Sequence, residues 1–262
     1  MTQYWKRYTL FGVVLYLVFL ITQIPATLVY GLFSDTLEAL PAKVKLYRVS
    51  GTVWSGKAAF VSASGNTLRD LSWELYPSSL LLGRVGLGLN FKLGDGSVKA
   101  ELYRTLGGDM LAKNIRARMP MSDIVRMARL PAIKLEGDLG LNLESLVLSD
   151  GLVSEAQGRV VWNSAETRFP QRIVLGDLSA NLQTTDAGIE ATLGDGGGPL
   201  EASGKLTLAP DGAYNFDGAF ASREGSNSPL ARSLSMMGRP DAQGKVQIKN
   251  AGNIKTLGFL FK

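Results

Sequence analysis

The sequence Ser50-Gly51-Thr52-Val53-Trp54-Ser55-Gly56-Lys57-Ala58, followed by Leu71-Ser72-Trp73-Glu74-Leu75-Tyr76-Pro77, indicates a protein built from β-strands. Valine and tryptophan favour strands, and the glycines beside them are typical of places where a strand bends, bulges or approaches another backbone. A weaker version of this pattern returns at residues 158–162. We therefore expect a mainly β fold with antiparallel strands.

Apolar side chains alternate with small or polar ones in several other segments. This period of two is typical of strands that bury one face. The apolar members are Leu87, Leu89, Phe91, Leu93, Leu139, Leu141, Leu143, Val246 and Ile248. Short helices are expected between strands, at residues 122–129 and 230–237.

Three pairs of strand-like segments share an offset of about 107 residues, which predicts an internal duplication. Residues 51–54 match 158–162, 68–75 match 175–182, and 137–139 match 244–246. The prediction is a first β repeat over residues 44–150 and a second over 151–262. The alternative is that glycine-led strands resemble one another by composition. Two repeats would continue one curved sheet or pack as related halves.

Residues 10–32 contain no charged side chain and, as a helix, are long enough to cross the hydrocarbon core of a bilayer. Basic residues precede this segment and acidic residues follow it, so the positive-inside rule places the N-terminus in the cytoplasm. The predicted layout is a cytoplasmic segment over 1–9, a transmembrane anchor over 10–33 and a linker helix over 34–43, with Ser34 as its N-cap. A cleaved signal peptide and a buried helix are the alternatives, and the lack of a good cleavage site favours the anchor.

The composition excludes several kinds of chemistry. The chain has no cysteine and no histidine, which removes disulfides, thiolate metal sites and histidine-based hydrolase triads. Its net charge of +5 is scattered, without the basic and aromatic clusters of nucleic-acid-binding proteins. We expect no catalytic, cofactor-binding or metal-binding residues and no nucleic-acid partner, but a mild attraction to anionic lipid headgroups.

Two motifs resemble catalytic or nucleotide-binding sequences without fitting them. Residues 51–58 nearly spell a phosphate-binding P-loop, but Ala58 stands where a Mg²⁺-binding hydroxyl is required. Ser55 and Lys57 would lie on one face of a strand, but nothing nearby suggests an oxyanion hole.

The residues selected as structural or interaction candidates fall into three groups. The first contains tryptophans and glycines expected to pack within strands. The second is an apolar stretch that is either a buried strand or a docking or lipid-contact surface. The third is a turn before a strand over 200–208. The candidates are Gly51, Trp54, Gly56, Trp73 and Trp162; Pro77, Leu80, Leu81, Leu82 and Gly83; and Gly198 and Pro199.

The chain resembles the type II secretion system protein N family of Gram-negative bacteria. The resemblance rests on the single apolar N-terminal segment and on residues 40–42, 49–56, 71–73, 77–83, 158–162 and 197–200. It implies a single-pass inner-membrane protein with a periplasmic β domain, accessory to the apparatus that exports folded proteins across the outer membrane. It implies no enzymatic activity, and contacts with other inner-membrane subunits.

The sequence therefore leaves two alternative functions for the β domain. In the first, the β domain is a non-catalytic structural or interaction subunit that uses sheet edges or apolar surface to contact its partners. In the second, it is a periplasmic lipid-handling module whose sheet forms an apolar groove. A continuous apolar lining would favour the second function, and an interior filled by side chains would count against it.

Overall fold

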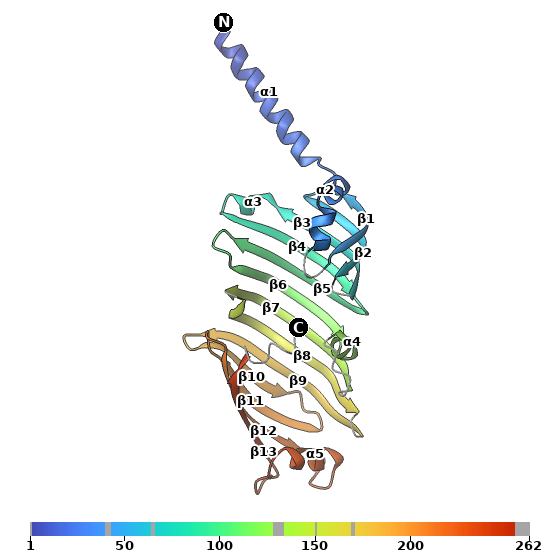
Figure 1. Ribbon diagram of the computed structural model, residues 1–262. Helices are drawn as coiled ribbons and strands as arrows, with labels where there is room; N and C mark the ends of the chain where they lie inside the picture. The colour runs from blue at the N-terminus through green and yellow to red at the C-terminus, as the bar shows by residue number, and fades with distance from the viewer. Residues whose placement is uncertain are drawn as a thin grey trace. The chain divides into compact units, whose positions relative to one another are not determined.

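The computed structural model describes residues 2–39, 43–63, 66–127, 134–149, 151–168 and 171–254. The chain forms two compact units, Met1–Lys92 (unit 1) and Leu93–Lys262 (unit 2), whose elements are labelled in Figure 1. Strands dominate both units, with a few short helices between them.

Unit 1 begins with two helices and continues into strands. Its elements are α1 (Thr2–Thr22), α2 (Ala26–Ala39), β1 (Lys45–Gly51), β2 (Ser55–Ala63), β3 (Asn66–Tyr76), α3 (Pro77–Leu80) and β4 (Arg84–Leu93), the last of which ends at the first residue of unit 2.

Unit 2 contains the longer strands. Its elements are β5 (Gly96–Thr105), β6 (Met110–Pro120), α4 (Met121–Met127), β7 (Leu135–Ser149), β8 (Leu152–Arg168), β9 (Arg172–Thr185), β10 (Gly188–Asp195), β11 (Leu200–Leu208), β12 (Ala213–Ser222), α5 (Pro229–Met237) and β13 (Val246–Asn253).

Within each unit, strands that follow one another in the chain are neighbours in the sheet. The registers from β1 to β3 and from β5 to β13 are antiparallel. The prediction of a mainly β fold with antiparallel strands is confirmed. The pairing of β7 with β8 crosses residue 150, so the strands on either side of the predicted repeat boundary belong to one sheet.

The apolar N-terminal segment does not form the single helix predicted over residues 10–33. Helix α1 ends at Thr22 and α2 begins at Ala26. Pro25 has no amide hydrogen to continue α1, and it forms a β-bridge with Thr52 instead. Ile24 also accepts a hydrogen bond from the Val53 amide at 3.0 Å. The predicted continuous anchor is therefore wrong, because this break is paired with the start of the sheet.

Among the residues that the structure describes, no helix combines the length and the apolar character needed to cross a membrane.

The predicted linker helix is also corrected. Ser34 is not an N-cap but lies inside α2, where its hydroxyl donates to the Gly31 carbonyl. The helix starts earlier because the chain leaves its pairing with Thr52 at Pro25. Residues 40–42, where the helix was expected to stop, lie outside the described residues.

The short helices inside the strand region agree with the sequence. Helix α4 occupies the first predicted position up to Met127, the rest of which lies outside the described residues, and α5 occupies the second. Helix α5 is capped by Ser228, whose hydroxyl accepts from the Ala231 amide at 3.1 Å.

Helix α5 lies beside β12 and β13, the last strands of unit 2 (Figure 1). Leu230 and Leu234 on α5 are buried against Ile173, Leu200 and Val246 of the strands. Val246 is the largest completely buried side chain among the described residues. Side chains of α5 and of the strands therefore form a packed core at this end of the sheet.

Candidate functional site: an apolar groove in unit 1

A groove of about 450 Å³ lies between α2 and the strands of unit 1. Both α2 and the strands supply apolar or aromatic side chains to its walls. The lining residues are Ala26, Val29, Tyr30, Phe33, Leu46, Val49, Val53, Leu71, Trp73, Leu75, Leu87 and Leu89. Its volume is within the range of roughly 300–1,000 Å³ that is usual for ligand-binding pockets.

Three hydrogen bonds hold the end of α1, the connection that follows it and α2 against the strands. The Trp54 indole N–H donates to the Ile21 carbonyl at 2.8 Å, and the Val53 amide donates to Ile24. Further along α2, the Tyr30 hydroxyl accepts from the Leu46 amide of β1 at 3.0 Å. These contacts hold the chain just before α2 and, through Tyr30, the helix itself, so α2 forms one wall of the groove.

A left-handed residue explains how β1 contributes two side chains to the lining. Leu46 and Val49 are three positions apart, and a regular strand would place them on opposite faces. Arg48 between them has a φ of 54°, a conformation in which the alternation of the strand is interrupted. Both side chains therefore reach the groove.

Trp73 lines the groove, and the position of its ring depends on Gly56. Gly56 lies directly opposite Trp73 in the β2–β3 pair, and a Cβ atom at Gly56 would overlap the indole ring. The indole N–H of Trp73 donates to the Val53 carbonyl at 3.0 Å. The absence of a side chain at Gly56 thus allows the ring to lie against the β2 backbone.

The chemistry of the lining is simple. Its two polar side-chain groups, the Tyr30 hydroxyl and the Trp73 indole N–H, each have a hydrogen-bond partner within the protein. None of the lining side chains carries a charge. The groove can therefore accept an apolar group, but it offers no obvious means of activating one.

Four of the candidate residues lie close to one another beside this groove. Trp73 lines it, Gly56 supports Trp73, and Trp54 joins the sheet to the end of α1. Gly51, with a φ of 89°, ends β1 opposite Gly56. Residues 51–58 form the end of β1, a short connection and the start of β2, as the strand interpretation predicts.

The apolar stretch after Pro77 is exposed. Pro77 begins the short helix α3, and a turn over Leu81 and Leu82 leads to Gly83, which has a φ of 66°. Leu80, Leu81 and Leu82 are 52%, 89% and 68% exposed. The buried-strand alternative is therefore wrong, and the surface alternative is the one that fits.

Trp162 lies in unit 2 and has a structural contact. It is opposite Leu139 in the β7–β8 pair, and its indole N–H donates to the Glu136 carbonyl at 2.9 Å. It does not join the groove.

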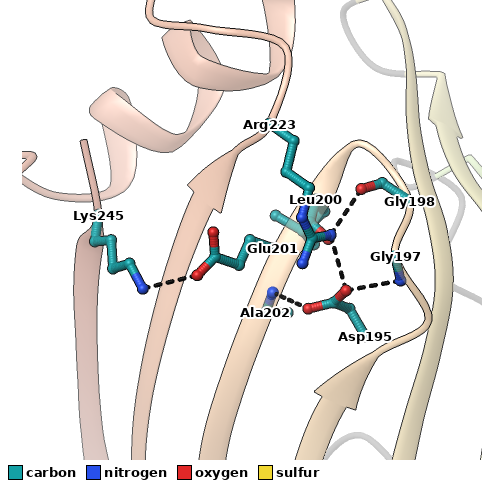
Figure 2. Close-up of polar contacts among 8 residues, drawn as sticks. All are labelled: Asp195, Gly197, Gly198, Leu200, Glu201, Ala202, Arg223 and Lys245. Carbon is teal, nitrogen blue, oxygen red and sulfur yellow. Dashed lines mark hydrogen bonds and ion pairs between the residues drawn. The ribbon is translucent and has the colours of Figure 1, made fainter. Parts of the chain in front are cut away.

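Gly198 and Pro199 form the predicted turn before β11, and a charged pair holds that turn (Figure 2). Arg223 donates to the Asp195 carboxylate and the Gly198 carbonyl, both at 2.8 Å, and to the Leu200 carbonyl at 3.1 Å. Asp195 also accepts from the Gly197 and Ala202 amides.

These contacts change the ionisation of the pair. The hydrogen bond from Arg223, with those from the two amides, lowers the pKa of Asp195 to about 2. The same hydrogen bond raises the pKa of Arg223. Beside them, Lys245 pairs with Glu201 at 2.7 Å, which raises the pKa of Lys245 (Figure 2). Each charge has an opposite partner, so we interpret this cluster as a clamp on the turn.

Gly198 also permits a close approach of two backbones. Its Cα lies so near Gly176 of β9, which has a φ of 95°, that a Cβ on either residue would meet the other's Cα at 2.6 Å. The turn at Gly198 and Pro199 therefore packs directly on β9.

The four groove residues of α2 were not predicted from the sequence; they are Ala26, Val29, Tyr30 and Phe33. Their uncharged surroundings in the sequence indicated a membrane helix instead. Pro25 was the signal in the sequence for a break before α2, since proline inside a helical pattern ends or kinks the helix.

In the described part of the chain, no group of three or more acidic residues is placed to hold a metal ion.

Sequence similarity to known proteins indicates the family to which the chain belongs. The family model described as type II secretion system (T2SS), protein N matches residues 42–249. The type II secretion system protein N of Aeromonas hydrophila is 30% identical over 92% of this chain and 95% of its own length. The protein of the same name from Vibrio cholerae is 26% identical over 82% and 87%, respectively. No solved structure matches the chain significantly. The match over most of the strand region means that the chain belongs to the type II secretion system protein N family.

Proposed function

We propose that this protein is a non-catalytic, accessory interaction subunit of the type II secretion apparatus, which exports folded proteins across the outer membrane. The observation that carries the proposal is the family match over residues 42–249. The architecture supports a binding role, since long antiparallel strands present extended surface and the groove contains no charged group. The partners are other inner-membrane subunits of that apparatus.

The proposal places the protein at the inner membrane, with its N-terminus cytoplasmic and its β domain in the periplasm. Support comes from α1, where apolar side chains are exposed along most of the described helix. They include Leu10, Phe11, Val13, Leu15, Phe19, Leu20 and Ile21. Large exposed apolar surfaces are typical of contact with a membrane or a partner.

For the partner-binding surface we propose the exposed leucines Leu80, Leu81 and Leu82. Three consecutive exposed leucines are unusual on a surface that contacts only water. They follow Pro77 and the buried Ser79, whose hydroxyl donates to the Tyr76 carbonyl. This hydrogen bond fixes the start of the turn without using the leucine side chains. A docking partner would bury these side chains at little cost in ordering the turn.

Two matched variants test this function. Leu81→Ser should lower the recovery of identified apparatus subunits with full-length tagged protein by about tenfold, because a central apolar contact is lost. Leu106→Ser is the control, since Leu106 is an equally exposed leucine (91%) in the turn between β5 and β6. Both variants should keep the wild-type melting temperature.

Equal recovery with both variants would contradict the leucine surface. Failure of the wild-type protein to recover any apparatus subunit from secreting cells would contradict the function itself.

We also propose that the β domain arose by duplication, with repeats over 44–150 and 151–262. The order of elements supports this: β3, β4, β5, β6, α4 and β7 are followed later by β9, β10, β11, β12, α5 and β13. In each series, a helix stands between the fourth and fifth strands, although α3 has no counterpart. An experimental structure in which β6, α4 and β7 fail to superpose on β12, α5 and β13 would contradict the proposal.

A further inference from the structure

We propose that the groove under α2 binds one acyl chain of a membrane phospholipid. This goes beyond the role in secretion and does not depend on the leucine surface at residues 80–82.

The lining selects for hydrocarbon. Its two polar side-chain groups are already paired, as described for Tyr30 and Trp73. The lining side chains offer no available polar group to the N–H and C=O groups of an extended peptide, and burying such groups unpaired is unfavourable. An acyl chain brings no polar group into the groove and buries apolar surface against its walls.

The size of the groove suits one chain. An apolar cavity of about 150 Å³ is enough for a benzene molecule with its six carbons. The groove has about 450 Å³, three times as much, and therefore has room for roughly eighteen carbons. That is the length of one common phospholipid acyl chain, not of two.

The surroundings point to a membrane as the source. Phe33 both lines the groove and is 55% exposed, so the apolar lining continues to the outside of α2. Leu28 and Leu32 of α2 are exposed as well.

In unit 2, helix α5 also packs on strands. Leu230 and Leu234 of α5 belong to a buried cluster with Ile173, Leu200 and Val246. In unit 1, α2 covers the strands but leaves an open volume. A covering helix therefore packs differently on its strands in the two units.

The test uses full-length protein and vesicles of phosphatidylethanolamine and phosphatidylglycerol. The vesicles contain a phosphatidylglycerol with a diazirine near the end of one acyl chain. After illumination, mass spectrometry locates the labelled residues. We expect label on the groove residues of β1, β3 and β4, including Val49, Leu71 and Leu89.

Filling the groove should prevent this labelling. The double variant Val49→Phe/Leu89→Phe should reduce groove label at least about fivefold, because the added rings occupy the space of the chain. Val85→Phe is the control, since Val85 is a half-exposed residue of β4 outside the lining. Circular dichroism checks folding, and each single variant carries the same prediction if the double variant fails to fold.

Three results would overturn the proposal. The first is label confined to α1, which indicates bilayer contact alone. The second is equal groove label in wild type and the filled variants, and the third is groove labelling by a diazirine fatty acid but not by the phospholipid.

The recovery of apparatus subunits is measured with the same filled variants, so that loss of lipid binding can be distinguished from loss of the function in secretion. Lost labelling with normal recovery would leave that function untouched.

Discussion

Gly56 and Trp73 show how one missing side chain shapes the groove. They are opposite one another in the β2–β3 pair, and the indole ring occupies the space that a Cβ at Gly56 would fill. The ring then reaches the Val53 carbonyl with its N–H. A glycine at this position therefore contributes through close approach and not through an unusual backbone conformation.

Gly56→Ala should lower the free energy of unfolding by about 1–3 kcal/mol, because the added methyl group displaces the half-buried Trp73 ring. Gly194→Ala is the control: Gly194 also lies in a strand, but its surroundings leave space for a Cβ. Urea unfolding followed by tryptophan fluorescence measures both variants. Equal stabilities for the two variants would contradict the proposed overlap.

Asp195 stabilises the folded protein by an amount that depends on pH, and the direction of that dependence follows from its pKa. Its pKa is about 2 in the folded protein and ordinarily 3.8, so protons bind the unfolded chain first as the pH falls. The stabilisation is therefore complete above pH 4 and is lost between pH 4 and pH 2. Asp195→Asn should cost about 1 kcal/mol at pH 7, since Arg223 is partly exposed and solvent weakens the pair.

Thermal or urea unfolding of wild type and Asp195→Asn from pH 7 to pH 2 checks this. The difference between the two proteins should shrink below pH 4. A difference that stays constant down to pH 2 would show that Asp195 is not the titrating group.

At the scale of single elements, α2 and α5 each pack on strands of their own unit, but different contacts hold them. Helix α5 contributes two leucines to a filled core, whereas α2 is tied to the strands by hydrogen bonds at its start and at Tyr30. The stability of α5 should thus depend on packing. That of α2 depends more on the few polar contacts that position it.

Leu230→Ala and Leu234→Ala should each destabilise the protein by about 2–5 kcal/mol, because each leaves a cavity in the core of unit 2. Met236→Ala and Met237→Ala on the same helix should change stability by less than about 0.5 kcal/mol, since both methionines are exposed. Differential scanning calorimetry compares the four variants. A large effect of Met236→Ala would mean that this face of α5 is covered.

At the scale of the whole molecule, charge and apolar surface act together. The net charge of +5 should draw the protein to anionic vesicles, while the exposed apolar side chains of α1 provide attachment that salt does not screen. Raising the salt from about 0.1 M to 1 M, which shortens the screening length from about 10 Å to about 3 Å, should weaken binding without abolishing it.

Vesicle flotation with and without phosphatidylglycerol measures this effect, and neutral vesicles serve as the control because their binding should depend little on salt. Salt-independent binding to both kinds of vesicle would exclude a contribution from the net charge.

The sequence alone determined the strands and their turns. Alternation at Leu139 to Leu143 and at Val246 and Ile248, and the turn before Leu200, depend on neighbours within a few residues, and the structure places strands and turns there. The short helices were predictable for the same reason. The absence of cysteine and histidine likewise needed no structure to interpret.

Only the tertiary structure decided what the apolar N-terminal run and the conspicuous residues do. Pro25 ends a helix because Thr52 and Val53 pair with the break, and Asp195 meets Arg223 from 28 residues away. Leu81 is exposed although its apolar neighbours suggested equally well that it is buried. Local sequence sets the conformation of each segment. The groove under α2 arises from contacts between distant segments, and these exist only after the sheet has formed.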